Sequence, residues 1–91
     1  MSVTASVTVE FFGIARARAG VPSTVAYGNT LGELLLELSH RYPELAASCL
    51  DGRQFRAGYA ANLGGNRFVT DPSTQLAAGD TVLLLSLDAG G

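Results

Sequence analysis

The sequence contains no lysine and no tryptophan, and it has one cysteine and one histidine. Without lysine there is no side-chain amine. If the C-terminal carboxylate were activated, the groups in the chain that it could acylate would be limited to the α-amine and weaker nucleophiles. All six basic residues are arginines, and the formal net charge is -2. That charge argues against nucleic-acid binding through phosphate neutralisation. A single thiol can form neither an internal disulfide nor, by itself, a metal site.

The lone cysteine and the lone histidine both lie in ordinary structural settings. Cys49 follows the apolar stretch that begins at Leu45, where a small buried thiol is typical. We therefore expect a structural role for it rather than a reactive one. His40 has no cluster of Cys, His or carboxylate residues near it in the sequence, so we predict neither a metal site nor a catalytic role for it.

Long hydrophobic runs are also missing. No segment approaches about 18 uninterrupted apolar residues, the length that a membrane span needs. The first residues lack the charged start and the apolar core of a signal peptide. A cytoplasmic location is the simplest expectation. The 91 residues, 47% hydrophobic and 15% charged, predict one globular domain spanning 1–91.

Period-two patterning marks the start of the chain. Residues 3–12 alternate between apolar and polar side chains, which predicts a half-buried strand. Phe12 interrupts the polar face of this strand. Gly13 and residues 15–20 are interpreted as a loop or turn. Residues 23–27 predict a second strand, paired with the first as a hairpin.

A helix is predicted after Gly28-Asn29. Thr30 and Glu33 have the spacing of a capping box, in which each side chain accepts from the other residue's amide. The helix should end near Tyr42, because Pro43 disfavours helical geometry in the residue before it. Its apolar stripe consists of leucines at helical spacing, Leu31, Leu34, Leu35 and Leu38.

The second half of the chain predicts mainly short strands. Residues 44–50 suggest a short helix and 53–57 a loop. Strands are predicted at 58–63, 67–69 and 81–87, and the last is apolar enough for the centre of a sheet. This order predicts an α+β domain in which one helix packs across one face of a mixed sheet. The β-grasp fold satisfies this description.

The chain ends in Asp88-Ala89-Gly90-Gly91. A diglycine without Cβ atoms can lie extended in a channel too narrow for other residues. Such a tail would offer the terminal carboxylate to another enzyme. The alternative is an ordinary frayed terminus, which glycine and small polar residues also favour.

Several short segments resemble one family in the same order along the chain. The chain resembles the MoaD/ThiS family of ubiquitin-like sulfur carriers, and it is more similar to MoaD, the small subunit of molybdopterin synthase, than to ThiS. The segments that carry the resemblance are Val9–Gly13, Thr30–Leu35, Tyr42–Leu45, Asn62 before Gly64-Gly65, Leu76–Asp80 and Gly90-Gly91. The ending, Leu-x-x-Gly-Asp followed by a strand and Gly-Gly, is the most specific of them.

One segment departs from the family pattern. MoaD proteins typically carry two prolines just before the tail, whereas residues 84–91 contain none and place Asp88 near the glycines. The tail is therefore less stiff than in typical MoaD proteins. The departure concerns the biosynthetic pathway rather than the carrier chemistry.

The resemblance implies a protein that carries sulfur on its C-terminus and is not catalytic alone. Gly91 would be adenylated by a ubiquitin-activating-type enzyme that uses ATP, and then converted to a thiocarboxylate. Gly90 and Ala89 would keep the tail slim enough to enter an active site. No cofactor is expected on the chain itself, and neither nucleic acid nor membrane is an expected partner.

The acceptor of the sulfur is left open. Molybdopterin precursor is the first choice, with the large subunit of molybdopterin synthase as partner; thiazole, cysteine or a thio-metabolite are alternatives. Two other functions fit the same tail: a ubiquitin-like modifier conjugated through Gly91, and a plain β-grasp binding module.

A partner surface is predicted on the sheet face that the helix leaves uncovered. By alternation Phe12 and Leu85 should lie there, with Leu83, Leu87 and Ala89 as further contacts. The alternatives are scattered surface hydrophobes, or cover by residues 43–57. Three arginines either line the rim of this surface or are simply solvated: Arg53, Arg56 and Arg67.

Overall fold

The computed structural model describes residues 4–87 of the chain. Within this range the elements, in chain order, are β1 (Ser6–Phe11), α1 (Gly13–Ala19), β2 (Ser23–Tyr27), α2 (Leu31–Arg41), α3 (Pro43–Cys49), β3 (Leu50–Asp51), β4 (Gln54–Phe55), β5 (Tyr59–Leu63), β6 (Arg67–Val69) and β7 (Thr81–Ser86).

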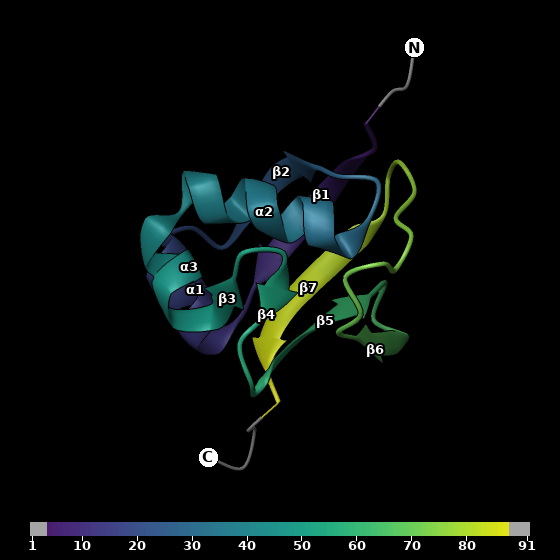
Figure 1. Cartoon of the computed structure of the whole chain (residues 1–91). Coiled ribbons are helices and arrows are strands. Elements are labelled where there is room, and N and C mark those ends of the chain that lie inside the picture. The colour runs from purple at the N-terminus through teal and green to yellow at the C-terminus, as the bar shows by residue number, and fades with distance from the viewer. Residues whose placement is uncertain (1–3, 88–91) are drawn as a thin grey trace.

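Five strands form one mixed sheet in the order β2-β1-β7-β5-β6. The last strand, β7, lies in the centre and runs parallel to β1, while every other neighbouring pair is antiparallel. Figure 1 shows α2 crossing one face of the sheet, with α1, α3 and the small β3–β4 pair on the same side. This is the β-grasp arrangement that the sequence predicted, with β7 in its predicted central place.

The core lies between the sheet and the helices. The inward positions of β1 are Val7, Val9 and Phe11, all buried, and Val82 and Leu84 of β7 lie beside them. The predicted stripe of α2 is fully buried against them, at Leu31, Leu34, Leu35 and Leu38. Each buried leucine contributes about 1.5–3 kcal/mol relative to an exposed one. The period-two strand and the period-3.6 helix therefore meet through the faces that their patterns predicted.

The predicted cap of α2 is present with one change. The Glu33 amide donates to Thr30 Oγ1 at 3.2 Å, as expected. The Glu33 carboxylate, however, accepts from the Asn29 amide at 2.8 Å rather than from the Thr30 amide. That part of the prediction was wrong by one residue. The outcome is still favourable, because a negative side chain lies at the positive end of the helix.

The segment after Phe12 is a helix and not the predicted loop. α1 contains three alanines and two arginines, which are strong helix formers. Gly20 ends it in the left-handed conformation with φ 81°, and its N–H donates to the Arg16 carbonyl. Ala15 packs into the core. β1 and β2 are antiparallel neighbours as predicted, but a helix connects them instead of the predicted loop or turn.

The second half of the chain follows the prediction closely. α3 begins at Pro43, which suits a first helical position, and the strands β5, β6 and β7 lie at the predicted places. The expected loop at 53–57 contains the two-residue strand β4, which pairs with β3.

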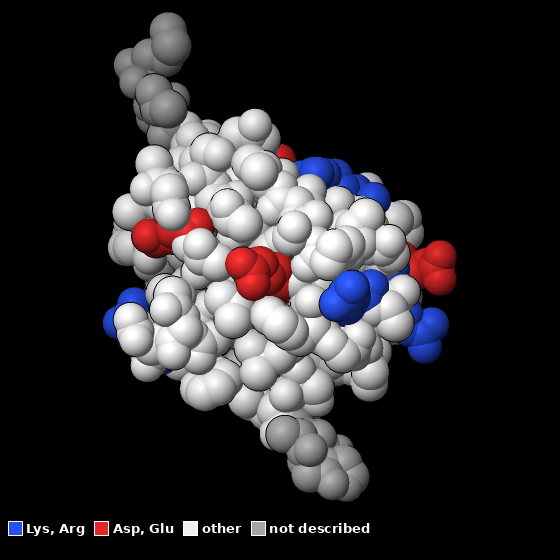
Figure 2. Space-filling model, turned by 180° about the vertical axis from the view of Figure 1, so that it is seen from behind, with Lys and Arg blue, Asp and Glu red and all other residues white. Residues whose placement is uncertain are grey.

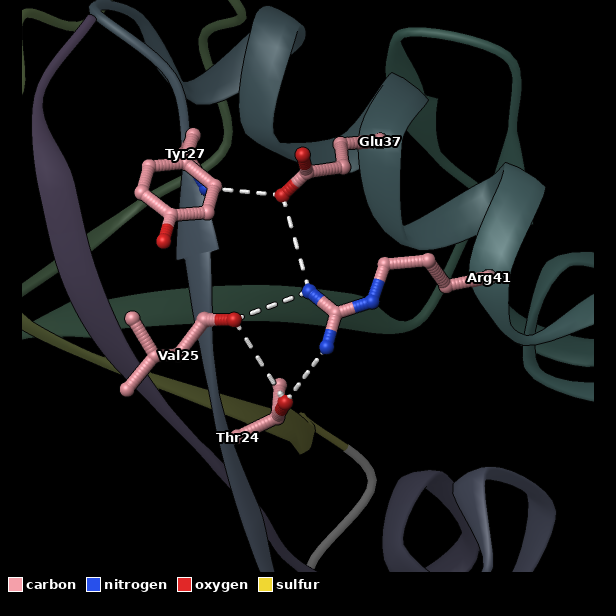
Figure 3. Close-up of polar contacts among 5 residues, drawn as sticks. All are labelled: Thr24, Val25, Tyr27, Glu37 and Arg41. Carbon is pink, nitrogen blue, oxygen red and sulfur yellow. Dashed lines mark hydrogen bonds and ion pairs between the residues drawn. The ribbon is translucent and has the colours of Figure 1, made fainter.

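Side chains from α2 bind the exposed edge of β2 (Figure 3). The Arg41 guanidinium donates to the Val25 carbonyl and to Thr24 Oγ1, both at 2.8 Å. The Glu37 carboxylate accepts from the Tyr27 amide at 2.7 Å and lies 3.6 Å from Arg41. Unpaired backbone groups on an edge strand are a template for unwanted pairing. The Glu37–Arg41 pair occupies those groups and attaches β2 to the helix layer.

Close backbone packing at Gly28 gives a test of the fold. A Cβ atom at Gly28 would lie 2.6 Å from the Leu34 backbone nitrogen, whereas one at Gly52 would meet nothing within 4 Å. We expect Gly28→Ala to lower the free energy of unfolding by about 3 kcal/mol through this clash. Gly52→Ala, whose backbone φ is 65°, should cost only about 1–2 kcal/mol of left-handed strain. Urea denaturation of both variants measures the difference, and equal losses would contradict the packing.

Candidate functional site

The helix-free face of the sheet carries the strand side chains that alternate with those facing the core. Strand register places Glu10 of β1 beside Leu83 of β7, and Leu83 opposite Asn62 of β5. Asn62 in turn lies opposite Phe68 of β6. Figure 2 shows this face from behind: most of it is uncharged, with an acidic group near its centre and basic groups toward its sides.

An apolar groove of about 390 Å³ lies on this face. It is lined by Phe12, Asn62, Gly65, Phe68, Leu83 and Leu85. Phe12 is 43% exposed and Phe68 60% exposed, so the two rings are open to solvent. A contiguous exposed apolar surface on a small domain is typical of an interaction site. The sequence placed Phe12, Leu83 and Leu85 together, and the structure does the same.

Phe68 and Asn62 are groove residues that sequence reasoning missed. Phe68 was available from the pattern, because the short strand 67–69 alternates and Phe68 is its outward position. Asn62 entered the sequence argument only as part of a family resemblance. The residue is 7% exposed, and no described residue gives its Oδ1 a hydrogen bond. A buried amide oxygen without a partner costs about 1–3 kcal/mol.

Residues 43–57 do not cover the groove. They form α3 and the β3–β4 pair, which pack beside α2 on the opposite face of the sheet (Figure 1). The alternative of a covered apolar patch is therefore excluded.

Of the two alternatives for the three arginines, the structure favours the solvated one, because all three are exposed and lie away from the groove. Arg67 alternates with the outward Phe68 on β6 and takes the other face. Arg53 and Arg56 belong to the β3–β4 region. None of the three lines the groove.

Leu87 lies apart from the groove, beside a second hollow of about 300 Å³. Its other lining residues are Gln54, Phe55, Arg56, Ala57, Gly58, Tyr59 and Thr70. Leu87 is 52% exposed, and its amide donates to the Gly58 carbonyl at 2.7 Å. This bond attaches the chain just before Asp88 to the start of β5. Ala89, Gly90 and Gly91 lie outside the described residues.

Cys49 is buried, with 2% of its surface exposed, in agreement with the predicted structural setting. Burial raises the pKa of its thiol above the ordinary value. A hydrogen bond from Tyr59 and the charge of Arg18 act in the opposite direction but are outweighed. Burial and the neighbouring Cys49 raise the pKa of the Tyr59 hydroxyl as well.

Away from both hollows, hydrogen bonds from Ser73 lower the pKa of Asp71, which stabilises the turn before β7.

Residues 4–87 contain neither a candidate metal site nor a candidate membrane-spanning helix. Within that range there is no group of three or more His, Cys, Asp or Glu residues that could hold a metal ion. Nor does any helix in that range have the length and apolarity to cross a membrane.

Comparison with known proteins gives likenesses in structure. No family model matches the chain, and no curated protein sequence matches it. The solution structure of small archaeal modifier protein 1 from Methanosarcina acetivorans matches with a TM-score of 0.79 at 24% identity, covering 99% of this chain and 100% of that one.

Two further structures are similar. A chain of the Amycolatopsis orientalis BexX/CysO complex matches with a TM-score of 0.77 at 24% identity, covering 93% of this chain and 99% of that one. A Pyrococcus furiosus protein provisionally named molybdopterin converting factor, subunit 1, matches with a TM-score of 0.73 at 23% identity, covering 90% and 97%. These likenesses confirm the ubiquitin-like β-grasp fold.

The burial of Cys49 gives a test. At about pH 8 the native thiol should react with iodoacetamide at least about 100-fold more slowly than the urea-unfolded chain, because it is buried and its raised pKa leaves little thiolate. The control is Ala47→Cys in a Cys49→Ser background, which puts a thiol on an exposed position of the same helix. Mass spectrometry follows both. Equal rates for native Cys49 and the control would contradict a structural, inert cysteine.

Proposed function

We propose that this chain is a ubiquitin-like sulfur carrier whose cargo is a thiocarboxylate on Gly91. The observation that supports this most strongly is the combination of a β-grasp fold with a Gly-Gly tail that follows the central strand β7. The structures of similar fold include a CysO and a protein provisionally named molybdopterin converting factor subunit 1.

The attachment of Leu87 to Gly58 suits a carrier of this kind. The last described residue is held against the domain, and the four residues after it span about 14 Å when extended. That length allows the terminal carboxylate to enter the active site of a partner while the domain stays outside. Gly90 contributes by lacking a side chain, and Ala89 by having a small one.

The carrier chemistry takes place in the partner enzyme. A carboxylate oxygen of Gly91 attacks the α-phosphorus of ATP, and pyrophosphate leaves. The resulting acyl-adenylate has a good leaving group, so a hydrosulfide equivalent adds to the carbonyl carbon and AMP departs. The thiocarboxylic acid then loses its proton. Because the chain has no lysine, it has no side-chain amine that could intercept the activated carbonyl.

We assign the docking of partner enzymes to the groove on the helix-free face of the sheet. Phe12 and Phe68 provide exposed rings, and Leu83 and Leu85 form an apolar floor. An apolar centre with aromatic residues is typical of the part of an interface that carries most of the binding energy. We assign this surface to the adenylating enzyme first, and to the enzyme that accepts the sulfur in a second, exclusive encounter.

For the sulfur acceptor, molybdopterin precursor is our first choice, with the large subunit of molybdopterin synthase as partner. The likeness to the Pyrococcus furiosus protein supports it, and the absence of the pre-tail prolines weighs against it. Thiazole, cysteine or another thio-metabolite are the alternatives. A gene for a molybdopterin synthase large subunit next to the gene for this chain would favour the first choice.

A second candidate function is protein modification through Gly91. The likeness to small archaeal modifier protein 1 favours it. Since this chain has no lysine, such a modifier would form single attachments and not lysine-linked chains of itself. An immunoblot of host lysate that shows covalent adducts of the chain on other proteins would support this candidate.

Thiocarboxylate formation is the direct test of the carrier proposal. Incubation with the host's ubiquitin-activating-type enzyme, ATP and sulfide should raise the intact mass by about 16 Da, the exchange of one oxygen for sulfur. Gly90→Val should abolish the shift, because the added side chain blocks threading. Ala17→Val, at an exposed position of α1, is the matched control and should react as the wild type does. No mass gain with the wild-type chain would contradict the proposal.

The docking groove is tested by removing one ring. Phe12→Ser should raise the Kd for the activating enzyme about tenfold or more, because a central aromatic contact is lost. Ile14→Ser is the control, since Ile14 is 48% exposed but does not line the groove. Calorimetric titration measures the Kd of both serine variants. Deletion of Gly90-Gly91 tests the alternative of a plain binding module, which would keep its affinity without the tail. Equal effects of the two serine variants would contradict docking at the groove.

A further inference from the structure

The hollow beside Leu87, here termed the tail hollow, lies where the chain leaves the domain toward its C-terminus. Leu87 and Gly58 both line it, and the Leu87 amide donates to the Gly58 carbonyl at 2.7 Å. This bond fixes the hollow, of about 300 Å³, relative to the start of the tail. An enzyme that takes up the tail therefore places the mouth of its channel over this hollow.

The polar side chains of the tail hollow offer hydrogen-bond donors and no carboxylate. Gln54, Arg56 and Thr70 are exposed and carry N–H or O–H groups, and no lining residue is Asp or Glu. The Arg56 guanidinium has no hydrogen bond or ion pair with any residue of 4–87. Asp51 lies opposite Gln54 in the β3–β4 pair, but it does not line the hollow, and within the described range it forms no ion pair.

A second positive charge lies near the tail hollow. Burial raises the pKa of the Tyr59 hydroxyl, and the charge of Arg18 acts on the same hydroxyl in the opposite direction. Tyr59 lines the hollow, and Arg18 is an exposed residue of α1, so Arg18 and Arg56 approach the hollow from different elements. The surroundings of the hollow are thus positive, although the formal net charge of the chain is -2.

We infer that the tail hollow receives a carboxylate side chain from the mouth of the partner enzyme's channel, and that the Arg56 guanidinium is its main donor. This inference rests on the proposed function and names the chemistry by which the partner recognises the start of the tail. A guanidinium presents its N–H groups in a planar fork that matches a carboxylate. A basic partner residue would be repelled, and an apolar one would cover Arg56 without pairing its charge.

The group that enters the tail hollow belongs to the enzyme and not to ATP. The reacting carboxylate of Gly91 is four residues beyond Leu87, about 14 Å along an extended tail, so the nucleotide lies at the far end of the channel. The docking groove is closer, because Leu85 lines it and is at most about 7 Å from Leu87. One enzyme surface can therefore cover the groove and the tail hollow together. Apolar contacts in the groove then govern how long the complex lasts, and the charge at the hollow governs how fast it forms.

Charge removal at Arg56 tests the inference in the full chain. ATP–pyrophosphate exchange by the host's ubiquitin-activating-type enzyme is measured against the concentration of the chain. The salt concentrations are about 0.1 M and about 0.5 M, where the screening lengths are about 10 Å and about 4 Å. We expect Arg56→Gln to raise KM for the chain about fourfold at low salt and Arg56→Glu about tenfold, with kcat and the KM for ATP unchanged. Both effects should shrink at least about twofold at high salt.

Arg67 supplies the matched control. Its side chain is exposed and, like that of Arg56, has no ion pair with another described residue. Strand register places Arg67 beside Leu63, which is about 13 Å along β5 from Tyr59. Because this distance exceeds the screening length at about 0.1 M salt, Arg67→Gln and Arg67→Glu should change KM by less than about 1.5-fold. Thermal unfolding of all four variants checks that each is folded.

The outcomes separate the inference from the function on which it rests. With an active wild-type chain, equal KM values for the Arg56 and Arg67 variants overturn the inference and leave the carrier function intact. An effect of Arg56→Glu that is as large at high salt as at low salt also overturns it, because a charge pair weakens on screening. A raised KM for ATP would place the nucleotide at the hollow and overturn it as well. No exchange with the wild-type chain overturns the carrier function itself, and the inference with it.

Discussion

The structure depends on the parallel pairing of its first and last strands. The Thr8 amide donates to the Asp80 carbonyl at 2.9 Å, and the Phe12 amide donates to the Leu84 carbonyl at 3.0 Å. These bonds join residues that are about seventy positions apart in the chain. Parallel neighbours require a long crossover, and here the whole set of helices supplies it on one face of the sheet. The leucine stripe of α2 then packs over the paired strands, which leaves the other face free.

The same pairing brings the functional features together. It places Phe12, which follows β1, on the same face as Leu83 and Leu85 of β7, and so creates one wall and the floor of the groove. It also makes β7 the central strand, and the Gly-Gly tail follows this best-supported strand. A sulfur carrier needs a rigid body that a partner can grip and a thin end that the partner can reach. In this chain we assign the surface that the partner binds to the groove beside β1 and β7, and the thin end to the Gly-Gly tail that follows β7.

Features that depend on local interactions could be predicted from the sequence, whereas features that depend on contacts between distant segments could not. Period-two alternation in residues 3–12 and the leucine spacing of α2 depend on local geometry, so they identified the core faces correctly. α1 was missed because the glycine-flanked segment was interpreted as a turn, although its alanines and arginines favour a helix. Asn62, Phe68 and Glu10 could not be placed in one row from the sequence, because their proximity depends on strand order and register. Leu87 was grouped with Leu85 by simple alternation, but β7 ends at Ser86 and alternation ends with it.

The most direct test of the central claim is the intact mass of this chain purified from its own host under conditions that preserve thiocarboxylates. The account predicts a second species heavier by about 16 Da, with fragmentation that assigns the added mass to Gly91. Deletion of the host's activating enzyme should remove that species. A chain that carries only an ordinary carboxylate, with or without the activating enzyme, would contradict the role of Gly91 as a sulfur-carrying end.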